Sequence, residues 1–131
     1  ENLLLLDDTY NANVDSLQAA IDVLKGYDAF RILLVGDMKE LGEDSLKCHQ
    51  AVGEHAKQAK LDLVLSYGIE SAVISEAVLG KHFTDKAELT AYALDIIKQK
   101  LQENQKVVVL AKGSRSMKME ETIYSLKDSL C

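Results

Sequence analysis

Leu3-Leu4-Leu5-Leu6-Asp7-Asp8-Thr9-Tyr10-Asn11-Ala12-Asn13 is the stretch that decides the fold. Consecutive leucines bounded by polar residues predict a short strand that is buried on both faces of a sheet. Two carboxylates follow where the strand would leave the sheet, and Asn13 precedes a helical pattern whose first N–H groups its side chain can cap. Because ligands bind outside the carboxyl ends of strands in an open α/β sheet, this exit loop is a candidate site.

Beyond this stretch, apolar runs alternate with helical patterns, without a break in composition. The pattern predicts right-handed βαβ units around a parallel sheet with helices on both faces. We therefore expect one domain over residues 1–131, a three-layer α/β/α Rossmann-like domain with a mainly parallel sheet of about five strands. Which strands are neighbours stays open. The expected later strands are 30–35, 61–66, 82–84 and 107–110, and the expected helices are 14–25, 44–60, 69–79, 86–103 and 119–129.

Composition narrows the class of protein. The chain has 131 residues, 47% of them hydrophobic, and its net charge of -6 argues against a nucleic-acid or anionic-membrane surface. No apolar run approaches the roughly 20 residues that span a bilayer. The 2 cysteines and 3 histidines match no zinc spacing, so we expect no metal site and a reducing compartment, the bacterial cytoplasm. Because the sequence begins almost directly in a strand, without Met, we expect it to be part of a longer protein.

Three strand-exit loops carry the polar residues that suggest chemistry. They are the Asp7–Asn13 loop, Gly36-Asp37-Met38 and Lys112-Gly113-Ser114-Arg115. Parallel strands would bring all three to one edge of the sheet. Paired carboxylates can hold Mg²⁺ or ribose hydroxyls, and Lys-Gly-Ser-Arg offers two cations, a hydroxyl and a glycine that lets backbone N–H groups approach an anion. The edge therefore suits a charged small molecule such as a nucleotide, a phosphate or a carboxylate.

Each of these residues also has a purely structural interpretation. Asp7 and Asp8 can cap the following turn, and Asp37 can be a turn residue. His49 lies on an apolar helical stripe, which favours hydrogen-bonded packing over catalysis. Lys112 and Arg115 can be a solvated pair, although the helix that follows disfavours cations at its start, which supports an anionic ligand.

Several motifs are missing. No Gly-x-Gly-x-x-Gly follows the first strand and no Gly-x-x-x-x-Gly-Lys-Ser/Thr occurs, so a standard dinucleotide site and a P-loop are both disfavoured. A phospho-receiver or other small-ligand-binding signalling module is an alternative, because the first strand ends in Asp-Asp and the fifth in Lys. A receiver also needs an aspartate after its third strand. Here that strand ends in Ser66-Tyr67-Gly68, and Asp62 lies at its other end.

A family resemblance goes further than these patterns. Asp7–Asn13, Gly36-Asp37-Met38 with Glu40-Leu41-Gly42, His49 with Gly53, and Lys112-Gly113-Ser114-Arg115 resemble, in order and spacing, the C-terminal domain of the Mur ligases. The resemblance covers nearly the whole chain and is strongest to the branch that adds D-alanyl-D-alanine to a UDP-N-acetylmuramoyl-tripeptide. Val14 departs from it, because the family usually has proline there, which we expect to alter loop stiffness more than chemistry.

The resemblance implies a role in ATP-dependent amide formation during peptidoglycan synthesis. In the family, ATP phosphorylates the tripeptide carboxylate and the incoming amine attacks the acyl phosphate. An N-terminal domain for the UDP-sugar and a central ATPase domain would lie outside this chain, and the central domain would hold most of the ATP and Mg²⁺ contacts. We therefore expect no catalytic residue and no ligase activity in this domain alone.

The resemblance also implies residue roles. Asp8 would contact the ribose of ATP, and Tyr10, Asn11 and Asn13 would lie over the nucleotide and the reaction centre. Lys112, Ser114 and Arg115 would face D-alanyl-D-alanine, with Arg115 or Lys112 on its carboxylate. The family strand order places the first and fifth strands side by side, and an antiparallel family strand that precedes the first one is missing here, so we expect an exposed sheet edge.

Overall fold

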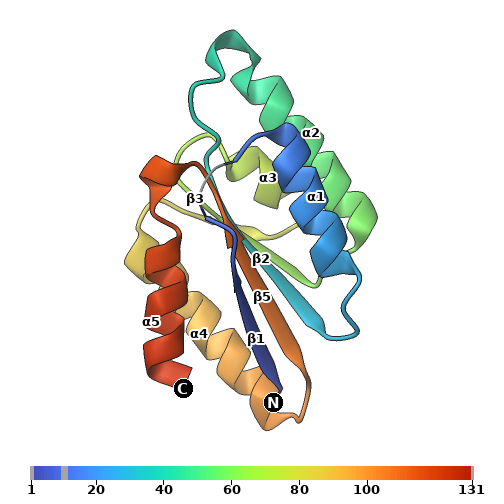
Figure 1. Cartoon of the computed structure of the whole chain (residues 1–131), viewed down its shortest axis with the longest axis vertical. Coiled ribbons are helices and arrows are strands. Elements are labelled where there is room, and N and C mark those ends of the chain that lie inside the picture. Colours follow the sequence, from blue (N-terminus) through green and yellow to red (C-terminus); the bar gives the residue numbers. More distant parts are fainter. Residues whose placement is uncertain (1, 10–11, 131) are drawn as a thin grey trace.

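A computed structural model describes residues 2–9 and 12–130. Its sheet has the order β1-β5-β2-β3-β4, and all four pairings are parallel (Figure 1). The sheet confirms the predicted fold class, and it confirms that the first and fifth strands are neighbours. The strands are β1 (Leu3–Asp7), β2 (Phe30–Gly36), β3 (Leu63–Tyr67), β4 (Lys81–Phe83) and β5 (Val107–Lys112).

Helices cover both faces of the sheet, as expected. Three pack on one face, and α4 and α5 pack on the other (Figure 1). Short 3₁₀ turns over Gly42–Asp44 and Arg115–Met117 precede α2 and α5. The helices are α1 (Val14–Lys25), α2 (Ser45–Ala59), α3 (Ala72–Ala77), α4 (Lys86–Gln102) and α5 (Glu120–Leu130).

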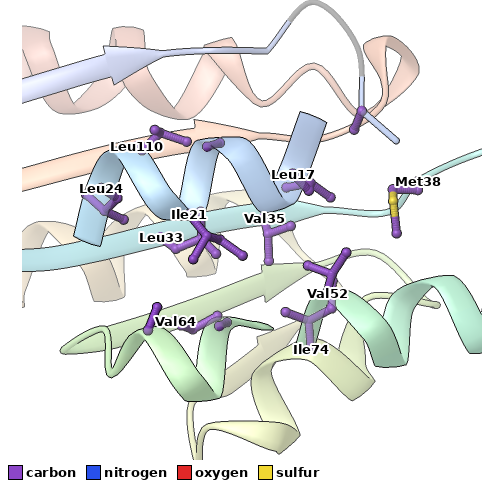
Figure 2. Packing of buried hydrophobic residues seen from close by; sticks show 14 of the residues in the cluster. Leu17, Ile21, Leu24, Leu33, Val35, Met38, Val52, Val64, Ile74 and Leu110 are labelled. Atoms are coloured by element: carbon purple, nitrogen blue, oxygen red, sulfur yellow. The ribbon is translucent and has the colours of Figure 1, made fainter. Parts of the chain in front are cut away.

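The core is split into two clusters by the sheet, because successive side chains of a strand point to opposite faces. In β2, Leu33 and Val35 pack with α1, α2 and α3, whereas Ile32 and Leu34 pack under α4 and α5. Figure 2 shows the first cluster, in which Leu17, Ile21 and Leu24 of α1 lie over the sheet. Burying one such side chain contributes roughly 1.5–3 kcal/mol, so the two clusters hold the strand exits in place.

Helix starts follow the predicted capping residues at two positions. The side chain of Asn13 accepts a hydrogen bond from the N–H of Ser16 at 2.8 Å, and the Ser16 hydroxyl accepts from the N–H of Asn13 at 2.9 Å, which completes a capping box. Asp85 caps α4 by accepting from the N–H of Ala87 at 3.0 Å.

Most element bounds lie within two residues of prediction, and two of the differences bear on the strand exits. The helix expected over 69–79 is only Ala72–Ala77, and the turn before it is held by the Asp37 carboxylate, which accepts from the N–H groups of Ile69 and Ser71. Lys112, expected in a loop, is the last residue of β5 and pairs with Val35 in register. Among the described strands, β1 pairs only with β5, so its outer edge is open and Leu4 is 41% exposed.

Candidate active-site edge

The exits of β1 and β5 lie side by side, because the two strands are parallel neighbours in which Asp7 is opposite Ala111. Lys112 Nζ lies 3.1 Å from Asp8 Oδ1 and 3.4 Å from the Asp8 carbonyl oxygen. The side chain of Lys112 is 5% exposed and that of Asp8 is 50% exposed. A buried ammonium needs a counter-charge, so Lys112 fixes the Asp8 carboxylate at the mouth while Asp8 stays accessible.

A cavity of about 290 Å³ opens at this edge and is lined by residues from the two ends of the chain. Arg115 and Asp8 both line it, which confirms that the first and last exit loops share one mouth. The Arg115 side chain is 60% exposed, and its Nη1 lies 2.6 Å from Glu120 Oε2. The cavity thus presents carboxylates and a guanidinium, groups that suit a small ligand carrying charges of both signs. Its lining residues are Asp7, Asp8, Thr9, Arg115, Glu120 and Tyr124.

The exit of β2 is organised by Asp37, which is fully buried. Its carboxylate accepts hydrogen bonds from the N–H of Ile69 at 2.9 Å and of Ser71 at 2.8 Å, and Lys39 Nζ lies 3.4 Å away. Burial raises the pKa of Asp37, but these backbone donors outweigh it and the pKa lies below its ordinary value. Asp37 is therefore a buried acceptor that fixes the loop between β3 and α3. The interpretation as a turn residue did not include this contact with a distant loop.

Ser114 joins the exits of β2 and β5. Its hydroxyl accepts a hydrogen bond from the N–H of Lys39 at 2.6 Å, and its own N–H donates to the carbonyl of Asp37 at 3.0 Å. The two backbones approach closely here, because a Cβ on Gly113 would lie 3.0 Å from the Gly36 Cα. Ser114 is buried, so its hydrogen bonds to the backbone of Lys39 and Asp37 support the site from within the protein.

His49 braces the same edge from α2. Its Nε2 accepts a hydrogen bond from the N–H of Met38 at 3.0 Å, and its Nδ1 lies 2.8 Å from the carbonyl of Ser45. These contacts assign the proton to Nδ1. The histidine is fully buried, which confirms the predicted packing role.

The structure thus separates the predicted site residues. Asp8, Lys112 and Arg115 come together, Ser114 is buried against the exit of β2, and the Asn13 side chain caps α1. Tyr10 and Asn11 lie outside the described residues. Glu120 was missed, because an acidic residue in a first helical turn is ordinary; its place five residues after Arg115 was the available signal.

Other features of the described chain do not compete with this edge. A larger cavity, about 630 Å³, lies where α2 and α3 end, and none of the predicted site residues lines it. Within residues 2–9 and 12–130, no cluster of three potential metal-binding side chains occurs. No helix in the same ranges has the length and apolarity to cross a membrane.

Two relatives align with nearly the whole chain. The UDP-N-acetylmuramoyl-tripeptide–D-alanyl-D-alanine ligase of Haemophilus influenzae is 71% identical over 129 residues, which are 98% of this chain and 28% of the relative. The ligase of the same name from Escherichia coli K12 is 48% identical over 130 residues, which are 98% of this chain and 28% of the relative. The chain therefore spans about 28% of the length of these relatives.

Solved structures and a family model agree with the fold. MurF from Acinetobacter baumannii superposes with a TM-score of 0.86 at 30% identity, over 95% of this chain and 27% of that one. MurF ligase from Thermotoga maritima in complex with ADP superposes with a TM-score of 0.83 at 28% identity, over 99% of this chain and 29% of that one. The model described as Mur ligase, glutamate ligase domain, matches residues 1–115. Fold, strand exits and sequence agree, and the chain belongs to the Mur ligase family.

Proposed function

We propose that this chain is the C-terminal domain of an ATP-dependent ligase that joins D-alanyl-D-alanine to a UDP-N-acetylmuramoyl-tripeptide. The reaction serves bacterial peptidoglycan synthesis, and with it cell shape and division, in the cytoplasm. The observation that carries the proposal is that Asp8 and Arg115 line the same cavity. The names of the relatives, which cover this chain almost completely, support the same reaction.

The full-length enzyme supplies the remaining parts. An N-terminal domain binds the UDP-sugar, and a central domain carries the P-loop. The tripeptide carboxylate takes the γ-phosphoryl group of ATP, and ADP leaves. The amine of the dipeptide then attacks the acyl phosphate, and inorganic phosphate and a proton leave as the amide forms. When this domain closes over the central one, water that would hydrolyse the acyl phosphate is excluded.

On the nucleotide side, Asp8 accepts hydrogen bonds from the ribose hydroxyls, and Tyr10, Asn11 and Asn13 lie over the nucleotide. Asp8 suits this role because its carboxylate is half-exposed and is oriented by Lys112 at 3.1 Å. Mg²⁺ would be held mainly by the central domain and the phosphates, and it would supply positive charge there.

On the amine side, Arg115 faces the dipeptide, and the buried Lys112 and Ser114 hold the neighbouring strand exits in place. Of the two cations, Arg115 is the better partner for the dipeptide carboxylate, because its side chain is 60% exposed and that of Lys112 is 5% exposed. A planar guanidinium also matches a carboxylate with two parallel hydrogen bonds.

Replacing Arg115 by alanine in the full-length ligase tests the proposal. A charge-assisted hydrogen bond is worth about 1.5–3 kcal/mol, so we expect KM for D-alanyl-D-alanine to rise at least about tenfold while KM for ATP stays nearly constant. Arg31→Ala is the matched control, because Arg31 pairs with Asp62 at the opposite end of the sheet. A change confined to KM for ATP would contradict the role given to Arg115.

The receiver-like alternative loses its support in the structure. Ser66 lies in β3 where a receiver carries its phosphorylated aspartate, and its hydroxyl is buried against Ser75 at 2.7 Å. Asp62 contacts Arg31 at the other end of the strands.

A further inference from the structure

Glu120 faces the cavity from the first turn of α5. Its Oε2 lies 2.6 Å from Arg115 Nη1, and its side chain is 15% exposed against 60% for Arg115. A guanidinium has five N–H donors in a fixed plane. A short contact on one Nη restrains that end of the group and leaves other N–H donors able to meet a second carboxylate.

The surroundings of Glu120 favour a permanent negative charge. Burial raises the pKa of its carboxyl, but its own backbone N–H and Arg115 outweigh this effect, and the pKa lies below its ordinary value. Its other oxygen, Oε1, is buried and has no hydrogen-bond partner among the described residues.

The adjacent glutamate shows that the placement is particular to Glu120. Glu121 is exposed and lies 2.7 Å from Lys86 Nζ, on the side of α4. It does not line the cavity that Glu120, Arg115 and Asp8 share. Two neighbouring carboxylates at the same helix start thus have separate partners, and one of them is directed at the mouth.

We propose that Glu120 is a positioning residue for Arg115, holding the guanidinium at the cavity so that its outer edge receives the carboxylate of the incoming dipeptide. This role rests on the proposed function. A long, mobile arginine side chain loses conformational entropy when it is fixed by a ligand. Glu120 fixes it in advance, so the dipeptide binds to a group that is already oriented.

Glu120→Gln in the full-length ligase tests this role, because it keeps the shape and removes the charge. We expect KM for D-alanyl-D-alanine to rise about five- to tenfold, with KM for ATP changed by less than about twofold. Glu121→Gln makes the same charge change one residue away and is expected to leave both constants within about twofold. Equal effects of the two substitutions on KM for the dipeptide would overturn the proposal.

Glu120→Asp gives a second variant that keeps the charge but withdraws it by one methylene. It is expected to raise KM for the dipeptide without raising KM for ATP. An unchanged dipeptide KM, or a parallel rise in both constants, would count against a positioning role.

A double-mutant cycle separates this inference from the proposed function. In an Arg115→Ala background, Glu120→Gln should change KM for the dipeptide by less than about twofold, because its target is gone. Full additivity would refute the inference. If Arg115→Ala alone has no effect on KM for the dipeptide, the proposed function is wrong; if it has an effect and Glu120→Gln has none, only the positioning role is wrong.

Discussion

At the residue scale, Lys112, Ser114 and Arg115 occupy three distinct environments, although they lie within four consecutive positions. Lys112 is buried against Asp8, Ser114 is buried against the N–H of Lys39, and Arg115 opens into the cavity. The motif predicted that these residues belong to one site, but it did not predict which of them is buried and which faces the cavity. That division depends on where β5 ends, which a run of small and polar residues does not specify.

Lys112→Met is expected to affect the nucleotide more than the dipeptide. Removing the ammonium leaves the Asp8 carboxylate without the cation 3.1 Å away that orients it. We expect KM for ATP in the full-length ligase to rise about tenfold, and KM for D-alanyl-D-alanine to rise less. Lys100→Met is the control, because Lys100 pairs with Glu103 far from the mouth. A rise in KM for the dipeptide alone would instead assign Lys112 to the dipeptide carboxylate.

Asp37→Asn is expected to lower stability in a pH-dependent way. The folded state lowers the pKa of Asp37, so its ionised form stabilises the fold above about pH 4, and this contribution is lost as the pH falls through the folded pKa. At about pH 7 the substitution should cost about 1–3 kcal/mol, because an amide cannot accept from both backbone donors as a carboxylate does. The difference should shrink by about pH 3.

Urea unfolding at both pH values measures this effect. Asp95→Asn is the control, because Asp95 is exposed on α4. If the Asp37→Asn variant differed from the unsubstituted chain by the same unfolding free energy at both pH values, the charge of Asp37 would not matter.

At the element scale, periodicity predicted every strand and helix in order but misplaced bounds where a distant side chain intervenes. The turn that leads into α3 is held by Asp37, which lies far back in the sequence and accepts from the N–H groups of Ile69 and Ser71. No local pattern carries that information. Caps are different, because Asn13 and Asp85 act on their own helices, and both were predictable.

Asn13→Ala is expected to combine a loss of helix stability with a loss of nucleotide binding. Losing the cap should cost about 1 kcal/mol of unfolding free energy, and Asn13 is one of the residues proposed to lie over ATP. Asp85→Ala removes a comparable cap from α4, away from the mouth, and should cost a similar amount while KM for ATP is unchanged. Chemical denaturation and steady-state kinetics measure the two effects. Identical kinetics for both variants would restrict Asn13 to capping.

At the scale of the whole molecule, alternating strands and helices predicted a parallel sheet between two helical layers, and the structure has it. The pattern alone left the strand order open, because any of several orders buries the same apolar faces. The family resemblance supplied the neighbouring first and fifth strands. Glu120 was not predicted, since only the packing of α5 beside β1 brings it to the cavity that Asp8 also lines.

The chain by itself is expected to turn over no ATP with D-alanyl-D-alanine and UDP-N-acetylmuramoyl-tripeptide. Its sequence has no P-loop to hold the triphosphate. A coupled assay for phosphate release, with the full-length ligase as the positive control, measures this. Turnover by the chain alone would falsify the assignment of the ATPase to another domain.

Because β5 lies between β1 and β2, β1 cannot join the sheet during synthesis until β5 has been translated. β1 emerges from the ribosome before the other strands, yet the strand that pairs with it in the described chain is translated last. Asp8 follows β1 and Arg115 follows β5, so the cavity that both residues line forms only after β5 pairs with β1. A nascent chain that stalls before Val107 exposes the apolar side chains of its unpaired strands and lacks the binding cavity. Chaperones bind and proteases degrade chains of this kind.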